Sequence, residues 1–276
     1  MNDIQTVVLE NFICFDRVCR NLGLRYFLVN GSALGAKKYA GFIPWDDDLD
    51  VAMPRKDYEI FLEKAQDLLP EHLFVQNYRT DKRFPLIYSK IRNSSTAFIE
   101  ESVRHLDMNH GVYIDIFPLD GFNPEDGGRL KELKIKILYW WAFSSIDDRS
   151  KIKIRVRNAV FRLFGFNKST HKALAAIEKS VCNNSENNVF WCNHGDRQGK
   201  KHIPREWYGN GTSAKFEGID VLIPERYDEY LSHKYGEWEK DLPVDKQISH
   251  HKATICDLTK SYKDYIYRDE TIKEDS

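Results

Sequence analysis

Residues 30–54 read NGSALGAKKYAGFIPWDDDLDVAMP, and this stretch places four aspartates within the five positions 46–50. No other five-residue window of the sequence holds four charges of one sign. The run YFLVN at residues 26–30 precedes it and predicts a buried strand, after which Gly31 and Ser32 open a predicted helix. Because the first N–H groups of a helix are unpaired and its dipole is positive there, this strand, turn and helix predict a cradle for a phosphate group.

The acidic part of the stretch predicts a strand that follows the breaker at residues 41–45. Asp46, Asp48 and Asp50 alternate at period two, which would place the three carboxylates on one face of that strand. Crowded carboxylates repel one another and resist ionisation, so such a face requires cations. Oxygen ligands of this kind suit Mg²⁺ or Mn²⁺. The alternative is a solvated acidic turn, against which the apolar residues flanking the acids count.

A further acid, Asp115, interrupts the apolar run VYIDIF at residues 112–117. An unpaired charge there would be costly, so Asp115 needs a cation or a hydrogen-bonding partner and is predicted as a third metal ligand. Lys90 and Arg92 lie two apart on a preceding strand-like run and therefore share a face. They are predicted to bind donor phosphates, with a solvated strand face as the alternative.

These residues resemble a known signature. A Gly-Ser turn, here Gly31 and Ser32, followed on a neighbouring strand by Asp-x-Asp, here Asp48 and Asp50, is similar to the signature of the nucleotidyltransferase superfamily. The longer string at residues 31–59 resembles more closely one branch of it, the LicD family of phosphocholine and related phospho-alcohol transferases.

Two further blocks carry the same resemblance. Residues 111–121 read GVYIDIFPLDG, and residues 216–243 run from FEG through KYGEW to LP. Lys38 and Tyr39 stand where LicD-like sequences usually show Arg and His. Lysine keeps the charge but lacks the bidentate fork of arginine, so the donor or acceptor preference can differ from that of other members.

The resemblance implies an enzyme that moves a phospho-alcohol, such as phosphocholine, from a CDP-linked donor such as CDP-choline to a sugar hydroxyl. The acceptor would be a cell-surface glycan (lipopolysaccharide, teichoic acid or capsule) or its lipid-linked precursor. The predicted catalytic and metal-binding residues are Asp48, Asp50 and Asp115, with Mg²⁺ or Mn²⁺ as cofactor. The predicted substrate-binding residues are Gly31, Ser32, Lys38, Lys90 and Arg92.

Two alternatives remain open for the function. One is nucleotidyl transfer to a small molecule or a nucleic acid, which needs the same carboxylates. The other is a binding protein that kept the fold and lost the reaction, against which the intact Asp48, Asp50 and Asp115 count.

Composition limits the partners and the cellular location that can be expected for this protein. The formal net charge of the 276 residues is −1, so no global field attracts nucleic acid, and none is predicted as a partner. The five cysteines are odd in number and contain no CxxC pair, which argues against a disulfide framework. The chain starts without a basic segment and has no run near the ~18–20 apolar residues of a membrane span. A cytoplasmic location is expected.

Residues 129–164 carry ten Lys or Arg against three Asp or Glu, an excess of 10 − 3 = +7, together with Trp140 and Trp141. Such a stretch can lie on an anionic membrane at the inner face. It can equally be a helical cap packed on the catalytic domain, which we favour.

Other polar residues are predicted to be structural. Asp120 precedes a glycine in an expected turn. The Cys and His residues within 189–202 fit no defensible zinc spacing, and His250 and His251 are typical of a polar surface.

The fold class predicted is α/β (α+β): a nucleotidyltransferase-like mixed β-sheet with flanking helices. Residues 1–125 would form the catalytic core, and residues 126–267 a mostly helical C-terminal part that completes the fold. The charged residues 268–276 are expected to be a disordered tail.

Overall fold

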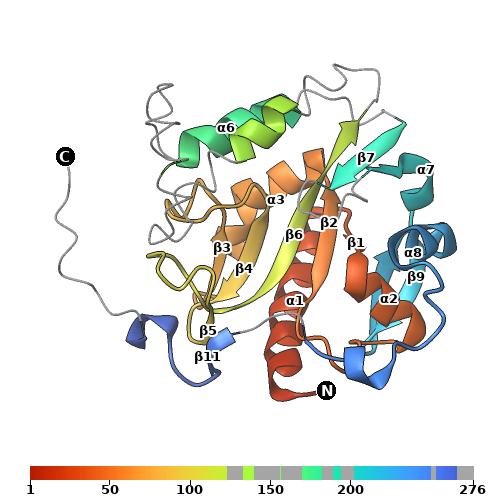
Figure 1. The fold of residues 1–276 in the computed structure, drawn as a ribbon, viewed down its shortest axis with the longest axis horizontal. Helices are drawn as coiled ribbons and strands as arrows, with labels where there is room; N and C mark the ends of the chain where they lie inside the picture. The colour runs from red at the N-terminus through yellow and green to blue at the C-terminus, as the bar shows by residue number, and fades with distance from the viewer. Residues whose placement is uncertain are drawn as a thin grey trace.

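The computed structural model describes residues 1–122, 133–139, 156, 170–181, 189–193, 202–249 and 253–265. In this described part, a seven-stranded sheet occupies the centre of the molecule, with helices packed on it (Figure 1). The predicted fold class, a mixed sheet with flanking helices, is confirmed.

The first half of the chain builds most of this sheet. Its strands are β1 (Phe27–Leu28), β2 (Asp50–Pro54), β3 (Leu73–Gln76), β4 (Ser89–Asn93) and β6 (Val112–Phe122), in the spatial order β1-β2-β6-β4-β3. β2 and β6 run parallel, whereas β4 is antiparallel to both β6 and β3. β7 (Phe190–Asn193) pairs with the far end of β6, and β8 (His202–Pro204) pairs with β7.

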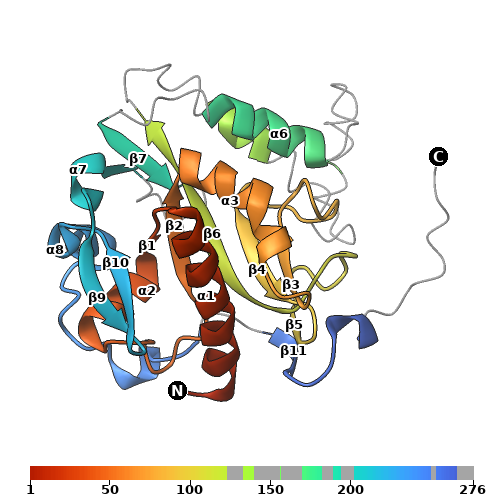
Figure 2. The same ribbon diagram turned by 180° about the vertical axis from the view of Figure 1, so that it is seen from behind.

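Two long helices cover one face of the sheet. α1 (Asp3–Leu22) and α3 (Arg55–Leu68) lie together in front of the strands when the molecule is seen from behind (Figure 2). α1 starts at a capping box between Asn2 and Gln5 and ends at Gly23, whose φ of 65° suits glycine. Its apolar stripe includes the fully buried Phe12 and Phe15.

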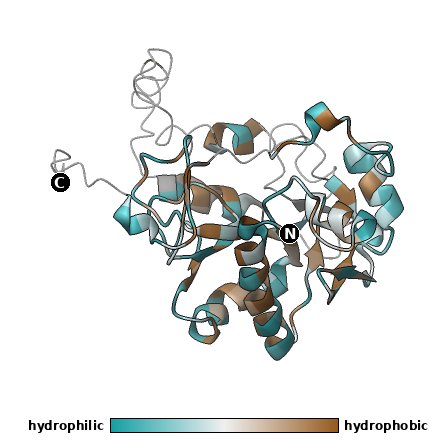
Figure 3. Ribbon diagram, turned by 90° about the horizontal axis from the view of Figure 1, so that it is seen from below, coloured by the Kyte–Doolittle hydropathy of each residue, from teal (hydrophilic) through white to brown (hydrophobic). Residues whose placement is uncertain are grey.

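Shorter elements surround this core. The helices are α2 (Asn30–Lys38), α6 (Thr170–Val181), α7 (Arg205–Tyr208) and α8 (Tyr227–Tyr235), with 3₁₀ turns η1 (Val244–Lys246) and η2 (Tyr262–Asp264). β5 (Ala97–Glu100) pairs with β11 (Ala253–Asp257). Coloured by hydropathy, the helices show brown segments beside teal ones, as expected for elements with one buried face (Figure 3).

A hairpin from the C-terminal part supports the segment that leads to the acids. β9 (Thr212–Phe216) and β10 (Ile219–Ile223) are joined by Glu217 and Gly218, both with positive φ. The Glu217 carboxylate accepts a hydrogen bond from Phe42 N at 3.1 Å. A Cβ on Gly41 would lie 2.1 Å from Oε1 of Glu217, so a larger residue there would displace the Glu217 carboxylate.

The described residues of the C-terminal part contain both helices and strands. These are β7 to β11 and α6 to α8, and of the strands β7 and β8 extend the central sheet. The basic stretch 129–164 falls mostly outside the described residues, as do Trp140, Trp141 and the tail 268–276. Within the described residues, no helix combines the length and apolar character needed to cross a membrane.

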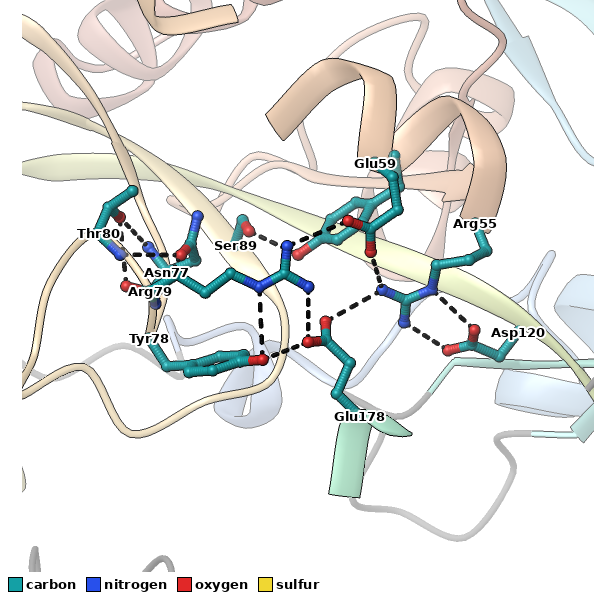
Figure 4. Close-up of polar contacts among 10 residues, drawn as sticks. Arg55, Glu59, Asn77, Tyr78, Arg79, Thr80, Ser89, Asp120 and Glu178 are labelled. Atoms are coloured by element: carbon teal, nitrogen blue, oxygen red, sulfur yellow. Dashed lines mark hydrogen bonds and ion pairs between the residues drawn. The ribbon is translucent and has the colours of Figure 1, made fainter. Parts of the chain in front are cut away.

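A partly buried ionic network joins α3, β6 and α6 (Figure 4). Arg55 donates to Asp120 through Nε and Nη2, at 2.8 and 2.6 Å, and through Nη1 to Glu178 at 3.3 Å. Arg79 donates to Glu178 at 2.6 Å, and Tyr78 also donates to it. Asp120 is therefore structural, as predicted, but it lies within β6 and not in a turn, because this bidentate pair with Arg55 holds it in the sheet.

Replacing Asp120 by Asn should destabilise the fold without changing chemistry in the folded fraction. The change leaves the buried Arg55 guanidinium short of a counter-charge, so we expect the free energy of unfolding in urea to fall by about 3 kcal/mol. Glu229→Gln, which removes the exposed partner of Arg226, is the control and should unfold like the parent. Normal stability of Asp120→Asn would show that the Arg55–Asp120 pair does not hold α3 to β6.

Candidate active site

Asp50 is the first residue of β2, whereas Asp46, Asp47 and Asp48 precede the strand. The predicted strand with three alternating acids is therefore wrong. Asp46 N donates to Ile43 O at 2.9 Å, and Gln5 Nε2 donates to Asp46 O at 2.7 Å. These bonds fix a turn over residues 43–46, so of the three acids only Asp50 lies in a strand.

The second acid, Asp115, lies directly beside Asp50 in the sheet. The two residues are register partners on the parallel strands β2 and β6, and Lys90 of β4 is the register partner of Asp115 on its other side. Register partners on neighbouring strands point to the same face. The row Asp50, Asp115 and Lys90 thus crosses three strands on one face of the sheet.

This face is the one opposite to α3. The hydroxyl groups of Ser89 and Tyr58, a residue of α3, are hydrogen-bonded at 2.5 Å, so Ser89 points toward α3. Because side chains alternate along a strand, the next residue, Lys90, points away from it. The acidic row therefore lies on the face of the sheet opposite to the one that α1 and α3 cover.

Electrostatics bring the three predicted acids into one group. Burial raises the pKa of Asp50 well above its usual value, and the charges of Asp48 and Asp115 raise it further. A hydrogen bond from Asn30 lowers this pKa in part. Ionising Asp50 is thus costly unless positive charge is supplied. Among the described residues, however, no three His, Cys, Asp or Glu side chains are already arranged to hold a metal ion.

Lys90 supplies positive charge to Asp115. Its Nζ lies 2.5 Å from Oδ1 of Asp115 and 3.3 Å from the centre of the Tyr113 ring. Burial lowers the pKa of Lys90, and the charge of Asp115 acts in the opposite direction. The partner that Asp115 was predicted to need is therefore present in the chain itself.

Arg92 shares the face of Lys90, as predicted. Both side chains lie over the ring of Tyr113, and the guanidinium carbon of Arg92 is 4.6 Å from the ring centre. Arg92 is 1% exposed. Its Nε donates to Gln76 Oε1 at 2.6 Å and its Nη1 donates to Gly111 O at 2.8 Å. Two of its donor groups are thus engaged with the protein, and phosphate binding by Arg92 stays a prediction.

Gly31 and Ser32 lie in the first turn of α2, as predicted, and both touch the acidic segment. Ser32 Oγ accepts a hydrogen bond from Asp50 N at 2.8 Å. A Cβ on Gly31 would lie 2.9 Å from Oδ2 of Asp46. This close approach places the start of α2 beside the acids.

Lys38 lies at the other end of α2. Its Nζ contacts Oδ1 of Asp241 at 2.8 Å and donates to Glu239 O at 2.9 Å. Lys38 thus binds to the loop that follows α8 rather than to the acidic row. Substrate binding by Lys38 stays a prediction.

Sequence reasoning missed Asn30 and Tyr230. Asn30 Nδ2 donates to Asp50 Oδ2 at 2.9 Å, and the Tyr230 hydroxyl accepts from Asn30 N at 3.1 Å. The position of Asn30 directly before the Gly-Ser pair is a signal that could have been used. Nothing local marks Tyr230, which is 200 residues away in the chain.

A cavity of about 600 Å³ lies near the other end of β6, lined by residues that include Arg25, Trp191 and Arg205. It contains none of the predicted site residues. The side chain of Cys192, residues 194–201, and His250 and His251 fall outside the described residues.

Comparison with known proteins agrees with the resemblance seen in the sequence. Residues 23–147 match the family described as LicD/FKTN/FKRP, nucleotidyltransferase domain. The chain is 26% identical over 263 residues to the lipopolysaccharide cholinephosphotransferase LicD of Haemophilus influenzae, covering 91% of this chain and 96% of that protein. The predicted resemblance to the LicD family is confirmed over residues 23–147, and the name of the relative agrees with the predicted enzyme class, a transferase of phosphate-containing groups.

Asp50→Asn and Asp115→Asn should change stability in opposite directions. Since the folded state raises the pKa of Asp50, its charge at neutral pH opposes folding, and Asp50→Asn should raise the Tm in EDTA by about 2–4 °C. Asp115→Asn removes the partner of buried Lys90 and should lower the Tm by more than about 5 °C.

Thermal unfolding followed by circular dichroism measures both shifts. Asp220→Asn, which removes the exposed partner of Lys215, is the control and should leave the Tm unchanged. Shifts of the same sign in the two variants would contradict the charge distribution described for this face.

Proposed function

We propose that this chain, which carries a LicD-type nucleotidyltransferase domain at residues 23–147, transfers a phosphocholine-like phospho-alcohol from a CDP-linked donor to a sugar hydroxyl. The acceptor is a cell-surface glycan, such as lipopolysaccharide, or its lipid-linked precursor. The named activity of the Haemophilus influenzae relative supports this choice of group and acceptor.

The observation that carries the proposal is the pairing of Asp50 and Asp115 on adjacent parallel strands, with the charge of Asp48 acting on Asp50. A chain gains no stability from crowding carboxylates in this way. Their crowding is understandable if they act on a cationic ligand. These residues fit Mg²⁺ or Mn²⁺ in the chemistry of their donors, because both ions prefer carboxylate oxygens.

Asp48, Asp50 and Asp115 would hold the cation, although the described residues do not show a preformed metal site. When bound, such an ion neutralises the donor diphosphate, lowers the pKa of the acceptor hydroxyl and stabilises the leaving phosphate oxygen. Asp115 is balanced by Lys90 in the present structure. A cation on Asp115 would therefore compete with Lys90, which could then turn its ammonium group toward a donor phosphate.

The residues at the start of α2 would bind and orient the donor. The start of α2 at Gly31 and Ser32 lies beside the acidic segment, so its N–H groups are suited to a phosphate oxygen of the donor once the acids are neutralised. In the reaction, the acceptor oxygen forms a bond to the distal phosphorus of the CDP-alcohol. The bond from that phosphorus to the bridging oxygen breaks, CMP leaves, and the hydroxyl proton passes to a carboxylate of the site or to solvent.

Nucleotidyl transfer is the competing reaction, and the available positive charge favours phospho-alcohol transfer over it. A nucleoside triphosphate brings more negative charge than a CDP-alcohol. Of the cationic residues predicted to lie near the phosphates, Lys38 is paired with Asp241, and two donor groups of Arg92 are used within the protein. Lys90 is paired with Asp115 and would compensate a phosphate group only after a cation takes its place there.

The proposal places the enzyme in the cytoplasm, where CDP-linked donors are made. Contact with the inner face of the membrane through residues 129–164 would bring a lipid-linked acceptor close to the site. Nucleic acid is not a proposed partner.

The products released by the purified protein test the proposed reaction. With Mg²⁺, CDP-choline and a lipopolysaccharide acceptor we expect CMP and a choline-modified glycan, and no pyrophosphate from CTP or ATP. EDTA, Asp48→Asn or Asp50→Asn should each lower turnover more than about 100-fold, since charge stabilisation at the phosphate is lost.

Lys215→Gln, which changes an exposed lysine on β9, is a control that should keep full turnover. Pyrophosphate release coupled to nucleotide incorporation would support nucleotidyl transfer instead. Full activity in EDTA would contradict the metal-dependent reaction.

A further inference from the structure

Asn30 has a backbone conformation that requires a reason. Its φ is 50°, in the left-handed region, although it is not a glycine. Such a conformation costs roughly 1 kcal/mol and persists only where surrounding contacts fix it. The residue lies at the junction of β1 and α2, immediately before the Gly-Ser pair.

The segment around Asn30 holds Asp50 at three points. Val29 N donates to Asp50 O at 3.1 Å, and Asp50 N donates to Ser32 Oγ at 2.8 Å. These two bonds fix the backbone of Asp50. The third bond, from Asn30 Nδ2 to Oδ2 of Asp50 at 2.9 Å, acts on the carboxylate itself.

The third bond engages one carboxylate oxygen. Within the described residues, Oδ1 of Asp50 accepts no hydrogen bond and forms no ion pair, so it is available to a ligand. An amide donor on Oδ2 restricts the rotation of the carboxylate and thereby sets the direction of Oδ1. Asn30 thus contacts the proposed metal ligand without being one.

Tyr230 fixes Asn30 in turn. Its hydroxyl accepts from Asn30 N at 3.1 Å and lies 3.4 Å from Asn30 Oδ1. Tyr230 belongs to α8 and is 1% exposed, and its ring contacts the ring of Tyr208 at 5.8 Å between centroids. A buried tyrosine from the C-terminal part is therefore hydrogen-bonded to both the backbone and the side chain of Asn30.

We propose that Asn30 and Tyr230 are positioning residues that orient the Asp50 carboxylate for cation binding, so that α8 completes the active site. This inference rests on the proposed function for the role of Asp50. It assigns a part in the active site to Tyr230, which lies beyond the matched domain at 23–147.

Two variants separate this role from a merely structural one. Asn30→Gly removes the amide and suits the positive φ, so the fold should be kept, with an unchanged or higher Tm. Tyr230→Phe removes the hydroxyl and keeps the buried ring. We expect Mn²⁺ affinity, measured by calorimetry on the full chain without donor, to fall about tenfold or more in each variant, as for other groups that orient metal ligands.

Turnover provides the second measurement. kcat for CMP release should fall about tenfold in each variant, while KM for the donor changes less than about twofold. Tyr230 acts on Asp50 only through Asn30. The kcat of the double variant should therefore be no more than about twofold below that of Asn30→Gly alone. Full additivity of the two losses would overturn the proposed chain of contacts.

Matched controls exist for both changes. Ala40→Gly relieves another positive φ, 54°, and Tyr26→Phe removes a buried hydroxyl that donates to Asp16 at 2.6 Å. Neither control should alter Mn²⁺ affinity, even where the Tm shifts.

The two measurements also separate this inference from the proposed reaction. Unchanged Mn²⁺ affinity and kcat in Asn30→Gly would overturn the inference and leave the reaction standing. Weakened Mn²⁺ binding in a protein that releases no CMP would support the inference and contradict the reaction.

Discussion

The repulsion between carboxylates that the sheet places side by side is the constraint that the surrounding contacts of the site must balance. Asp50 and Asp115 face each other across parallel strands, and neither can move away, because the backbone of each is bonded into β2 and β6. Their charges oppose folding unless balanced. The chain balances Asp115 with Lys90 and orients Asp50 with Asn30, which leaves Asp50 as the point where additional positive charge is most favourable. A phosphate-transferring enzyme needs such a point, since negative charge accumulates on its substrate.

The later parts of the chain hold the acidic segment in place. The β9–β10 hairpin bonds to Phe42 through Glu217, and α8 reaches Asn30 through Tyr230. On the other side of the sheet, the Arg55 network ties α3 to β6 and α6 (Figure 4). The matched domain at residues 23–147 therefore depends on contacts from outside its own limits.

Local patterns in the sequence predicted the strand, turn and helix around Gly31, and the resemblance predicted the family. They also gave the face shared by Lys90 and Arg92, since that follows from alternation alone. The strand predicted for Asp46 and Asp48 was wrong, because the turn at Ile43 and the contact from Gln5 are not visible in a periodic pattern. The Lys90–Asp115 pair and the Tyr230–Asn30 contact join residues distant in the chain, and only strand register and helix packing reveal them.

Anomalous diffraction from crystals soaked with Mn²⁺ and CDP tests the central claim most directly. The account predicts a manganese peak within about 2.5 Å of carboxylate oxygens of Asp50 and Asp115, with the ammonium group of Lys90 displaced from Asp115. A peak elsewhere, or no peak with the Lys90–Asp115 pair intact, would contradict the role given to these carboxylates.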